Sequence, residues 1–186
     1  MISFLDVFSR VKFWKEADRL GPDFPLTQLA LFFPKSMTKL CLKKFKLFGT
    51  NAEFRPGAHA EACSKISIGR NVVIRPGTFL YADPRENGGS IIIEDDVLIG
   101  PAVHFYANNH DFSKRDVPII SQGYPEASNS DTIIVRRNSW IGAACVILPG
   151  VEIGMGSVIG AGTVVTRSVP PGVIFAGNPG KVLRKI

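Results

Sequence analysis

Residues 135–170 divide into groups of six that read VRRNSW, IGAACV, ILPGVE, IGMGSV, IGAGTV and VTRSVP. An aliphatic residue opens every group, and the openers are Val135, Ile141, Ile147, Ile153, Ile159 and Val165. A small or β-branched residue stands at the fifth place, and glycine often fills the second. A period of six fits neither the turn of a helix nor the plain alternation of an isolated strand. It predicts short strands joined by tight corners, with the first and fifth residues pointing inward.

The same period extends upstream of this stretch. Aliphatic or aromatic openers recur at Ile68, Ile74 and Leu80 and, in a new phase, at Ile93, Ile99 and Phe105. Three such strands make a coil of roughly 18 residues, and coils that stack about 4.8 Å apart form a parallel β-helix. We therefore expect a mainly β fold with the inward aliphatic residues as its core. The alternative, an ordinary β-sandwich, would require six unbroken groups to arise by coincidence.

Residues 1–50 lack the repeat and carry apolar residues at helical spacing. We expect helices over about the first twenty residues, over 26–33 and over 35–48, the last with Ser36 as N-cap and Gly49 as its stop. These helices would cover the open end of the solenoid, which otherwise exposes unpaired strand edges. Because the third helix is basic, the alternative is a docking face for an anionic acceptor or a membrane surface.

The expected organisation has three parts, which are a helical cap and acceptor segment over 1–50, a β-helix with a loop at 111–132 over 51–170, and a terminal tail over 171–186. Two interruptions break the repeat, a short polar one at Tyr81–Gly89 and a long one at Asp111–Thr132. Long excursions from a regular scaffold usually carry function. We therefore look for the functional residues near these two segments.

Composition excludes several classes of function. The net charge of +6 and the 45% share of hydrophobic residues describe a globular chain without a basic stripe for nucleic acid. Cys41, Cys63 and Cys145 are odd in number and lack metal-ligand spacing, so we expect reduced cysteines in a cytoplasmic protein. The segment Met1–Lys15 lacks a signal-peptide pattern, and no stretch is long and apolar enough to span a bilayer.

His110 is the strongest candidate for chemistry. It closes the group of six that begins at Phe105 and lies at the mouth of the longer interruption. The sixth place of a group points outward, so the imidazole is available to a partner. A neutral imidazole is the ordinary general base at neutral pH. The polar run Asn108–Asp111 stands where the repeat expects an apolar residue, which favours a functional histidine over an incidental one.

The loop position, the pair Asn109–His110 and the run Trp140–Gly142 resemble the sugar O-acetyltransferases of the hexapeptide-repeat acyltransferase superfamily, in its galactoside, maltose and xenobiotic acetyltransferase-like branch. The resemblance covers about residues 56–186. It implies left-handed coils, acetyl-CoA as co-substrate, no metal, and a homotrimer with active sites between subunits. It also implies that His110 takes the proton of an acceptor hydroxyl, whose oxygen attacks the thioester. The expected acceptor is a sugar or a surface polysaccharide of the O-antigen or capsule type.

Further site residues follow from the same resemblance. Asp111 is a candidate orienter of the imidazole, although a backbone carbonyl could do the same work. Tyr81, Asp83 and Asn109 fall near the place where such enzymes bind the acceptor. The segment around Asp83 departs from the family's pattern, which puts that assignment in doubt.

Ala143 and Ala161 are eighteen residues apart, so they should stack at the same corner of neighbouring coils. Small residues there would leave a groove for pantetheine, with backbone N–H groups near a developing oxyanion. Plain steric packing at the corner is the alternative. The resemblance implies CoA contacts at Trp140, Ala143, Ala161, Thr166, Arg167, Lys181 and Arg184, of which the basic ones suit phosphates. Residues 176–182, AGNPGKV, resemble the family's terminal CoA-binding loop, with Gly180 in place of the usual Ala or Cys.

Other functions compete with this interpretation. Metal-dependent hydration needs three histidines on one metal, but His104 and His110 should lie on different sides of a coil, and His59 shows no matching phase. A non-catalytic scaffold has no reason to keep an exposed histidine beside a CoA-type tail. Among transferases, the runner-up is N-acetylation of a nucleotide-linked amino sugar. Peripheral membrane contact through the basic third helix stays open.

Overall fold

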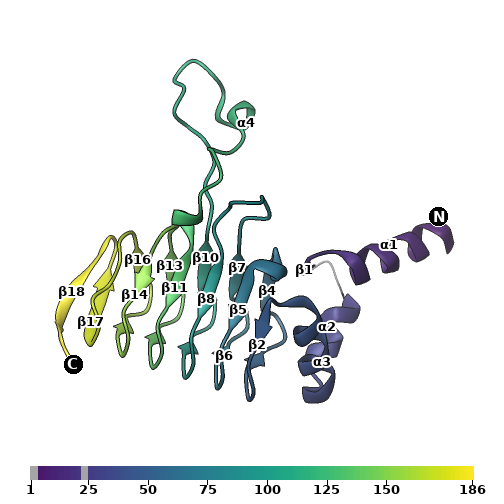
Figure 1. Ribbon diagram of the computed structural model, residues 1–186, viewed down its shortest axis with the longest axis horizontal. Helices are drawn as coiled ribbons and strands as arrows, with labels where there is room; N and C mark the ends of the chain where they lie inside the picture. The colour runs from purple at the N-terminus through teal and green to yellow at the C-terminus, as the bar shows by residue number, and fades with distance from the viewer. Residues whose placement is uncertain (1–3, 22–24) are drawn as a thin grey trace.

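The computed structural model describes residues 4–21 and 25–186, most of which build three sheets of short strands stacked along one axis (Figure 1). Sheet A contains, in order, β1 (Arg19–Leu20), β4 (His59–Glu61), β7 (Phe79–Tyr81), β10 (His104–Tyr106), β13 (Val146–Ile147) and β16 (Val164–Val165). Sheet B contains β2 (Leu47–Phe48), β5 (Ile66–Ile68), β8 (Ile91–Ile93), β11 (Ile133–Val135) and β14 (Glu152–Ile153). Sheet C contains β3 (Glu53–Phe54), β6 (Val73–Ile74), β9 (Leu98–Ile99), β12 (Trp140–Ile141), β15 (Val158–Ile159), β17 (Val173–Gly177) and β18 (Gly180–Lys185).

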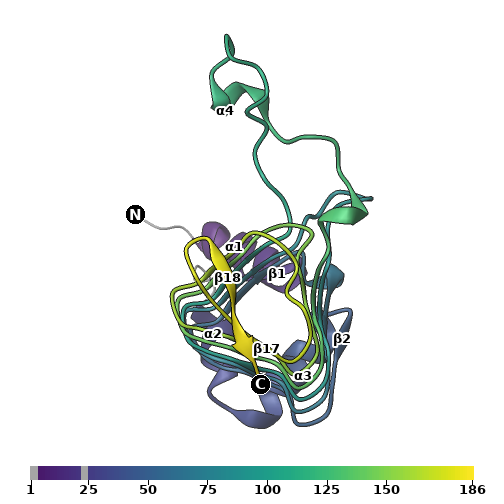
Figure 2. The same cartoon turned by 90° about the vertical axis from the view of Figure 1, so that its left-hand side faces the viewer.

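The chain visits sheets B, C and A in turn, so neighbouring strands of one sheet come from successive coils. Within sheet C, for example, Trp140 pairs in parallel with Leu98 on one side and with Val158 on the other. Figure 2 looks along the stack, where successive coils overlay one another. The predicted parallel β-helix is confirmed by this pairing pattern.

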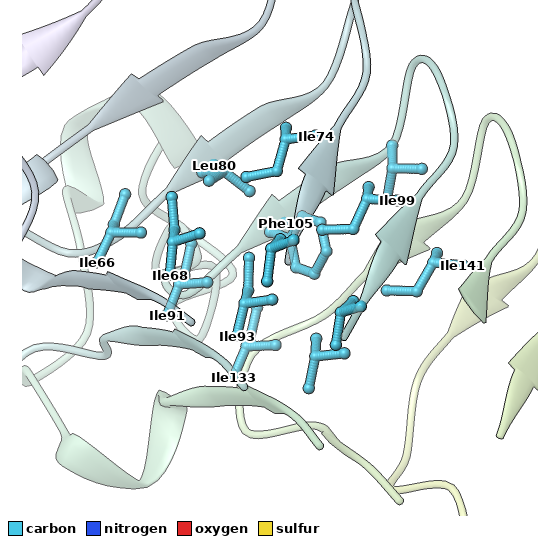
Figure 3. Close-up of a cluster of buried hydrophobic side chains, with 14 of the residues drawn as sticks. Ile66, Ile68, Ile74, Leu80, Ile91, Ile93, Ile99, Phe105, Ile133 and Ile141 are labelled. Carbon is cyan, nitrogen blue, oxygen red and sulfur yellow. The ribbon is translucent and has the colours of Figure 1, made fainter. Parts of the chain in front are cut away.

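The residue that opens each group of six lies in the core. The side chains that are 0% exposed include Val135, Ile141, Ile147, Ile153, Ile159 and Val165. Figure 3 shows the same inward ladder upstream, where isoleucines from neighbouring strands pack around Phe105. Burying an aliphatic side chain of this size stabilises a fold by roughly 1.5–3 kcal/mol. The repeated opener is therefore the main source of stability along the stack.

The polar residues at the fifth place are buried and bonded to corner carbonyls. The Ser139 hydroxyl donates to the carbonyl of Gly154 at 3.1 Å, and the Thr163 hydroxyl donates to that of Gly160 at 2.6 Å. A buried hydroxyl is costly unless it is hydrogen-bonded. Serine and threonine are tolerated here because the corners supply the acceptors.

Glycine at the second place reflects how closely the coils approach one another. A Cβ atom on Gly142 would lie 2.6 Å from the backbone nitrogen of Ala161, and one on Gly100 would lie 2.7 Å from that of Ala143. No side chain fits between backbones at these distances. The corners after β9 and β12 therefore select glycine on steric grounds.

Three helices precede the coils, α1 (Phe4–Glu16), α2 (Pro25–Leu31) and α3 (Pro34–Lys44). The first is shorter than predicted because Arg19–Leu20 pair with β4. The prediction for the third is wrong at both ends. Phe33 occupies the N-cap position without a side-chain cap bond, so Ser36 is not the cap. The helix stops at Lys44 because the chain beyond it extends and Leu47–Phe48 pair with β5.

The helices α2 and α3 lie beside the first coil, as Figure 1 shows. Cys41 of α3 is fully buried, and the ring of Phe45 lies 5.3 Å from that of Phe54 in β3. Gln28 of α2 accepts a hydrogen bond from the backbone N–H of Gly57 at 2.8 Å. The expected boundary between residues 50 and 51 falls between β2 and β3, both of which pair with strands of the next coil.

Two excursions leave the stack where the chain turns from sheet A to sheet B. The first excursion, residues 82–90, joins β7 to β8, and the second, residues 107–132, joins β10 to β11. The second contains α4 (Ile119–Gln122) and a short 3-10 helix at Asn129–Asp131, while another such helix at Cys63–Lys65 precedes β5. In Figures 1 and 2 the second excursion extends away from the coils.

The C-terminal segment extends sheet C. Strand β17 pairs in parallel with β15, and β18 returns antiparallel to β17. The tail thus remains part of the stack after Pro170–Pro171, where the repeat ends. None of the helices in the two described ranges is long and apolar enough to cross a membrane.

The inward and outward faces of β8 make a direct test of the core. Ile93 is 1% exposed and Ile92 is 37% exposed on the same strand. We expect Ile93→Ala to lower the free energy of unfolding by roughly 2–5 kcal/mol, because it leaves a cavity among packed neighbours. The matched variant Ile92→Ala should lower it by less than about 1 kcal/mol. Urea denaturation followed by circular dichroism measures both, and equal losses would contradict the assigned faces.

Candidate active site

A cavity of about 560 Å³ opens where the two excursions leave the stack. Its volume lies within the range of about 300–1,000 Å³ typical of small-molecule sites. Its lining comes from the ends of sheet A strands and from both excursions, and consists of Glu61, Tyr81, Ala82, Asp83, Pro84, Arg85, Tyr106, Asn108, Asn109, His110, Tyr124, Leu148 and Pro149. Four of the five residues predicted for catalysis and acceptor binding therefore line the cavity, and Asp111 does not. The four are Tyr81, Asp83, Asn109 and His110.

His110 is exposed and stands four residues beyond the end of β10. Its Nδ1 atom lies 3.3 Å from the backbone carbonyl oxygen of Gly123. A carbonyl oxygen can only accept a hydrogen bond, so in the neutral imidazole Nδ1 carries the proton and Nε2 keeps the lone pair. The imidazole also stacks on the Tyr124 ring, with centroids 4.6 Å apart and planes 23° from parallel. The Gly123 carbonyl and the Tyr124 ring thus fix the orientation of the imidazole.

Asp111 does not face the imidazole in the way that an orienting carboxylate would. Its carboxylate accepts from the backbone N–H of Ser113 at 2.9 Å, and this bond lowers the pKa of the carboxyl. Its own N–H donates to the Gly123 carbonyl at 3.0 Å. Of the two orienters left open by the sequence, the geometry therefore favours the backbone carbonyl. Asp111 stabilises the turn that begins the second excursion instead.

Asn109 lies beside His110 on the cavity wall. Its side-chain oxygen accepts a hydrogen bond from the backbone N–H of His110 at 3.1 Å. This contact fixes the local backbone at the start of the excursion. The predicted acceptor-binding place of Asn109 agrees with its position in the cavity lining.

Two stacked tyrosines form an amphipathic wall of the cavity. The Tyr81 and Tyr106 rings lie 5.4 Å apart and only 3° from parallel. Burial raises the pKa of the Tyr81 phenol, and the nearby Glu61 carboxylate raises it further. The phenol therefore stays protonated at neutral pH and can donate a hydrogen bond. Such a wall offers an apolar face and polar edges to a ligand.

Asp83 is fully buried, and its carboxylate binds the guanidinium of Arg85. Hydrogen bonds from Arg85 hold the pKa of the Asp83 carboxyl below its ordinary value, which keeps it ionised. Both carboxylate oxygens accept from Arg85. This arrangement differs from the predicted acceptor-binding role, because the oxygens already have partners within the protein.

Ala143 and Ala161 stack one coil apart at the same corner, where the N–H of Gly162 donates to the Ala143 carbonyl at 2.8 Å. This corner joins sheet C to sheet A, whereas His110 follows the corner that joins sheet A to sheet B. Leu148, in the cavity lining, follows β13, whereas Ala143 precedes that strand. The alanine corner and the cavity therefore lie at opposite edges of sheet A.

The C-terminal turn lies near the alanine corner. A Cβ atom on Gly180 would lie 2.9 Å from the methyl carbon of Thr163 and closer still to the Phe175 ring. This crowding explains glycine at a place where the resemblance leads one to expect Ala or Cys. Lys181 and Arg184, the predicted phosphate contacts, follow on β18 and are exposed.

The remaining predicted CoA contacts lie at two different places on the stack. Trp140 is 51% exposed on the outer face of sheet C. Thr166 and Arg167 are exposed and follow β16, at the same edge as the cavity. The N–H of Leu148 donates to the carbonyl of Val165, so these two residues lie one coil beyond the cavity lining.

The structure also reveals cavity residues that the sequence did not single out. Glu61, Tyr106, Arg85 and Tyr124 all line the cavity. Tyr106 pairs with Tyr81 in sheet A, but the first excursion lies between them and hides the repeat. The one sequence feature that could have pointed to Arg85 as a cavity residue was its position two residues after Asp83.

The sequence analysis predicted that His59 would not fall in the repeat phase of the other histidines, and this prediction is wrong. His59 and His104 both pair with Phe79, and their rings lie 4.6 and 4.9 Å from its ring. The excursions change the spacing between coils, which concealed this column in the sequence. Among the residues of the two described ranges, no group of three His, Cys, Asp or Glu side chains lies close enough to hold a metal.

Comparison with known proteins places this geometry in context. Residues 132–167 match the family model described as bacterial transferase hexapeptide (six repeats). A galactoside O-acetyltransferase from Escherichia coli K12 is 35% identical over 147 residues, which cover 79% of this chain and 67% of that protein. A galactoside O-acetyltransferase from Lactococcus lactis is 31% identical over 183 residues, which cover 94% of this chain and 80% of that protein.

A solved structure shares the fold. The hexapeptide-repeat acetyltransferase from Vibrio cholerae, complexed with acetyl coenzyme A, matches with a TM-score of 0.72 and 28% sequence identity. The match covers 85% of this chain and 82% of that chain.

Proposed function

Because the chain belongs to the hexapeptide-repeat acyltransferases, a family that includes galactoside O-acetyltransferases, we propose that it transfers an acetyl group from acetyl-CoA to a sugar hydroxyl with His110 as general base. The observation that carries this proposal is the contact between His110 Nδ1 and the Gly123 carbonyl at 3.3 Å. It leaves Nε2 with a lone pair at the wall of a cavity large enough for a sugar ring.

The reaction needs one proton acceptor and one stabilised oxyanion. The Nε2 atom of His110 takes the proton as the acceptor oxygen attacks the thioester carbonyl of acetyl-CoA. The tetrahedral intermediate then collapses, the carbon–sulfur bond breaks, and the imidazolium returns the proton to the leaving CoA sulfur. Backbone N–H groups at the coil corner of Ala143 are the proposed donors to the oxyanion.

The proposed CoA site uses the alanine corner and the C-terminal strand. The small side chains of Ala143 and Ala161 leave room for an extended pantetheine chain along the stack. Lys181 and Arg184 supply positive charge for the phosphates. Trp140, Thr166 and Arg167 complete the predicted set, and left-handed winding of the coils belongs to the same proposal.

A homotrimer follows as the proposed assembly, because the alanine corner and the His110 cavity lie on opposite edges of sheet A. A neighbouring copy could present its alanine corner to the cavity and complete the site. Sedimentation equilibrium should therefore give the mass of three 20.2 kDa chains under assay conditions. A monomer that turns over acetyl-CoA with acceptor would contradict the shared site.

The proposed acceptor is a carbohydrate, in a surface polysaccharide or its precursor. Tyr81 and Tyr106 offer stacked aromatic faces, and the Glu61 carboxylate is about half exposed at the cavity edge, where it also faces Arg19 at 3.8 Å. A sugar ring has apolar faces and a rim of hydroxyls, which suits aromatic walls with polar edges. Transfer to an amino sugar is the second outcome that an acceptor panel would detect.

Loss of the base should abolish turnover without abolishing CoA binding. In an assay of CoA release from acetyl-CoA with a panel of sugars and nucleotide sugars, we expect His110→Ala to lower kcat by roughly 10²- to 10⁴-fold. Calorimetry should give a Kd for CoA within about threefold of wild type, since His110 is proposed to act on the acceptor.

His59→Ala is the matched control, because it removes a histidine that does not line the cavity. It should retain acceptor-dependent turnover. Undiminished turnover in His110→Ala would remove His110 from the mechanism, and failure of wild type to bind CoA would overturn the proposed function.

The basic third helix is proposed to contact an anionic acceptor, polymeric or lipid-linked, or its membrane surface. Lys39 and Lys43 on α3 and Lys46 after it are exposed. Lys44 differs, because it donates to the carbonyl of Ala17 and burial lowers its pKa. The exposed lysines, and not Lys44, are therefore the residues to vary.

Reversing two of these charges should weaken acceptor binding selectively. We expect Lys39→Glu with Lys43→Glu to raise KM for a polyanionic acceptor by at least about 30-fold, at about 1 kcal/mol for each lysine lost, and less so at high salt. KM for a neutral monosaccharide should stay unchanged. Arg137→Glu, at the turn from sheet B to sheet C, is the control. If KM for both acceptors stays unchanged, α3 covers the first coil and does nothing more.

A further inference from the structure

Arg85, in the first excursion, is fixed in place by a buried carboxylate. Its Nε atom lies 3.0 Å from both oxygens of Asp83, and its Nη2 atom donates to one of them as well. The Asp83 side chain is 1% exposed, while that of Arg85 is 34% exposed. Lys65 donates to the backbone carbonyl of Arg85 from the other side. A charge-assisted contact at several points fixes the plane of the guanidinium.

From this position Arg85 contacts the second excursion, about forty residues later in the chain. Its Nη1 atom donates to the backbone carbonyl of Pro125. The guanidinium carbon lies 5.4 Å from the centre of the Tyr124 ring, within the range of a cation–π contact. Most residues of the second excursion are exposed. Arg85 therefore joins the two excursions at the point where the second returns to the cavity.

The segment that Arg85 holds is the one that touches His110. The Tyr124 ring stacks on the imidazole at 4.6 Å, and the Gly123 carbonyl faces Nδ1 at 3.3 Å. Gly123 has a φ of +72° and a ψ of −128°, a backbone conformation that favours glycine, and its carbonyl faces the histidine. Because Gly123, Tyr124 and Pro125 are consecutive, fixing the last two adds to the contact of the Asp111 N–H, which donates to that carbonyl at 3.0 Å.

We propose that Arg85 is a positioning residue that, through Tyr124 and the Gly123 carbonyl, holds His110 in the tautomer with its proton on Nδ1. The catalytic consequence rests on the proposed role of His110 as base, whereas the tautomer itself does not. In the other tautomer a proton would occupy Nε2, where the base needs its lone pair. Arg85 thus sets the fraction of enzyme that is ready to accept a proton.

Arginine suits this role in a way that lysine does not. The guanidinium is planar, binds both Asp83 oxygens, keeps Nη1 for Pro125 and still lies over an aromatic ring. A lysine ammonium is a compact point charge and cannot make these contacts together. Arg85→Lys therefore keeps the charge and loses the geometry.

Nitrogen-15 NMR of the full-length labelled protein reads the tautomer directly. At a pH where the imidazole is neutral, the wild-type His110 signal, assigned by its loss in His110→Ala, should show the proton on Nδ1. In Arg85→Met the signal should move toward a mixture with substantial Nε2 protonation, and Arg85→Lys should resemble Arg85→Met. This reading needs no turnover, so it decides the positioning role even if the chain transfers no acetyl group.

Kinetics give the second readout. Arg85→Met should lower kcat by roughly 10- to 100-fold and leave KM for acetyl-CoA within about twofold. Tyr124→Leu should have a similar effect, and the double variant should be no worse than the more impaired single one, because both act through one chain of contacts. Additive losses would show independent roles and overturn the proposal.

Arg70→Ala is the matched control for loss of a paired arginine. Arg70 binds Asp95 through Nε at 3.0 Å and Nη2 at 2.7 Å, on a corner away from the cavity. It should leave both the His110 tautomer and kcat unchanged. A native circular dichroism spectrum for Arg85→Lys, together with an unchanged tautomer, would overturn the positioning role. Wild type without acceptor-dependent turnover would instead overturn the proposed function.

Discussion

Parallel pairing between successive coils is the interaction on which the rest of the structure depends. Strands of neighbouring coils lie about 4.8 Å apart, and at that spacing every residue stands directly over its counterpart in the next coil. Inward places therefore become continuous ladders, such as the one through Ile68, Ile93 and Val135. The same spacing leaves no room for a side chain at the tightest corners, which explains Gly100 and Gly142. One geometric constraint thus accounts for the apolar opener, the small fifth residue and the glycine.

The same constraint determines where chemistry can be located. Inside the ladder, backbone groups are paired and side chains are packed, so an adjustable site has no space there. Both excursions leave at the turn from sheet A to sheet B, in successive coils. Because the coils stack, the starts of the two excursions lie next to each other and form the cavity around His110. His110 lies on the second excursion, and the paired strands β10 and β11 fix the two ends of that excursion.

The arrangement of charges at the cavity depends on one buried carboxylate, that of Asp83. Asp83 is ionised and fully buried, which is costly unless the charge is paired. Arg85 supplies that pairing and reaches the second excursion with the rest of its guanidinium. A buried ion pair of this kind contributes geometry more than stability. Its partners on the second excursion, in turn, contact the imidazole.

The sequence by itself determined the coils, because a period of six is a local property that every strand repeats. It also predicted a functional role for His110, which stands where the repeat ends and a long polar segment begins. The end of α3 was misjudged, because pairing of Leu47–Phe48 with β5 overrides the helical spacing of that segment. The contacts of Arg85 with Tyr124 and Pro125 were decided by the tertiary structure alone. They join residues about forty positions apart in two segments without periodicity, and no local pattern can encode such a meeting.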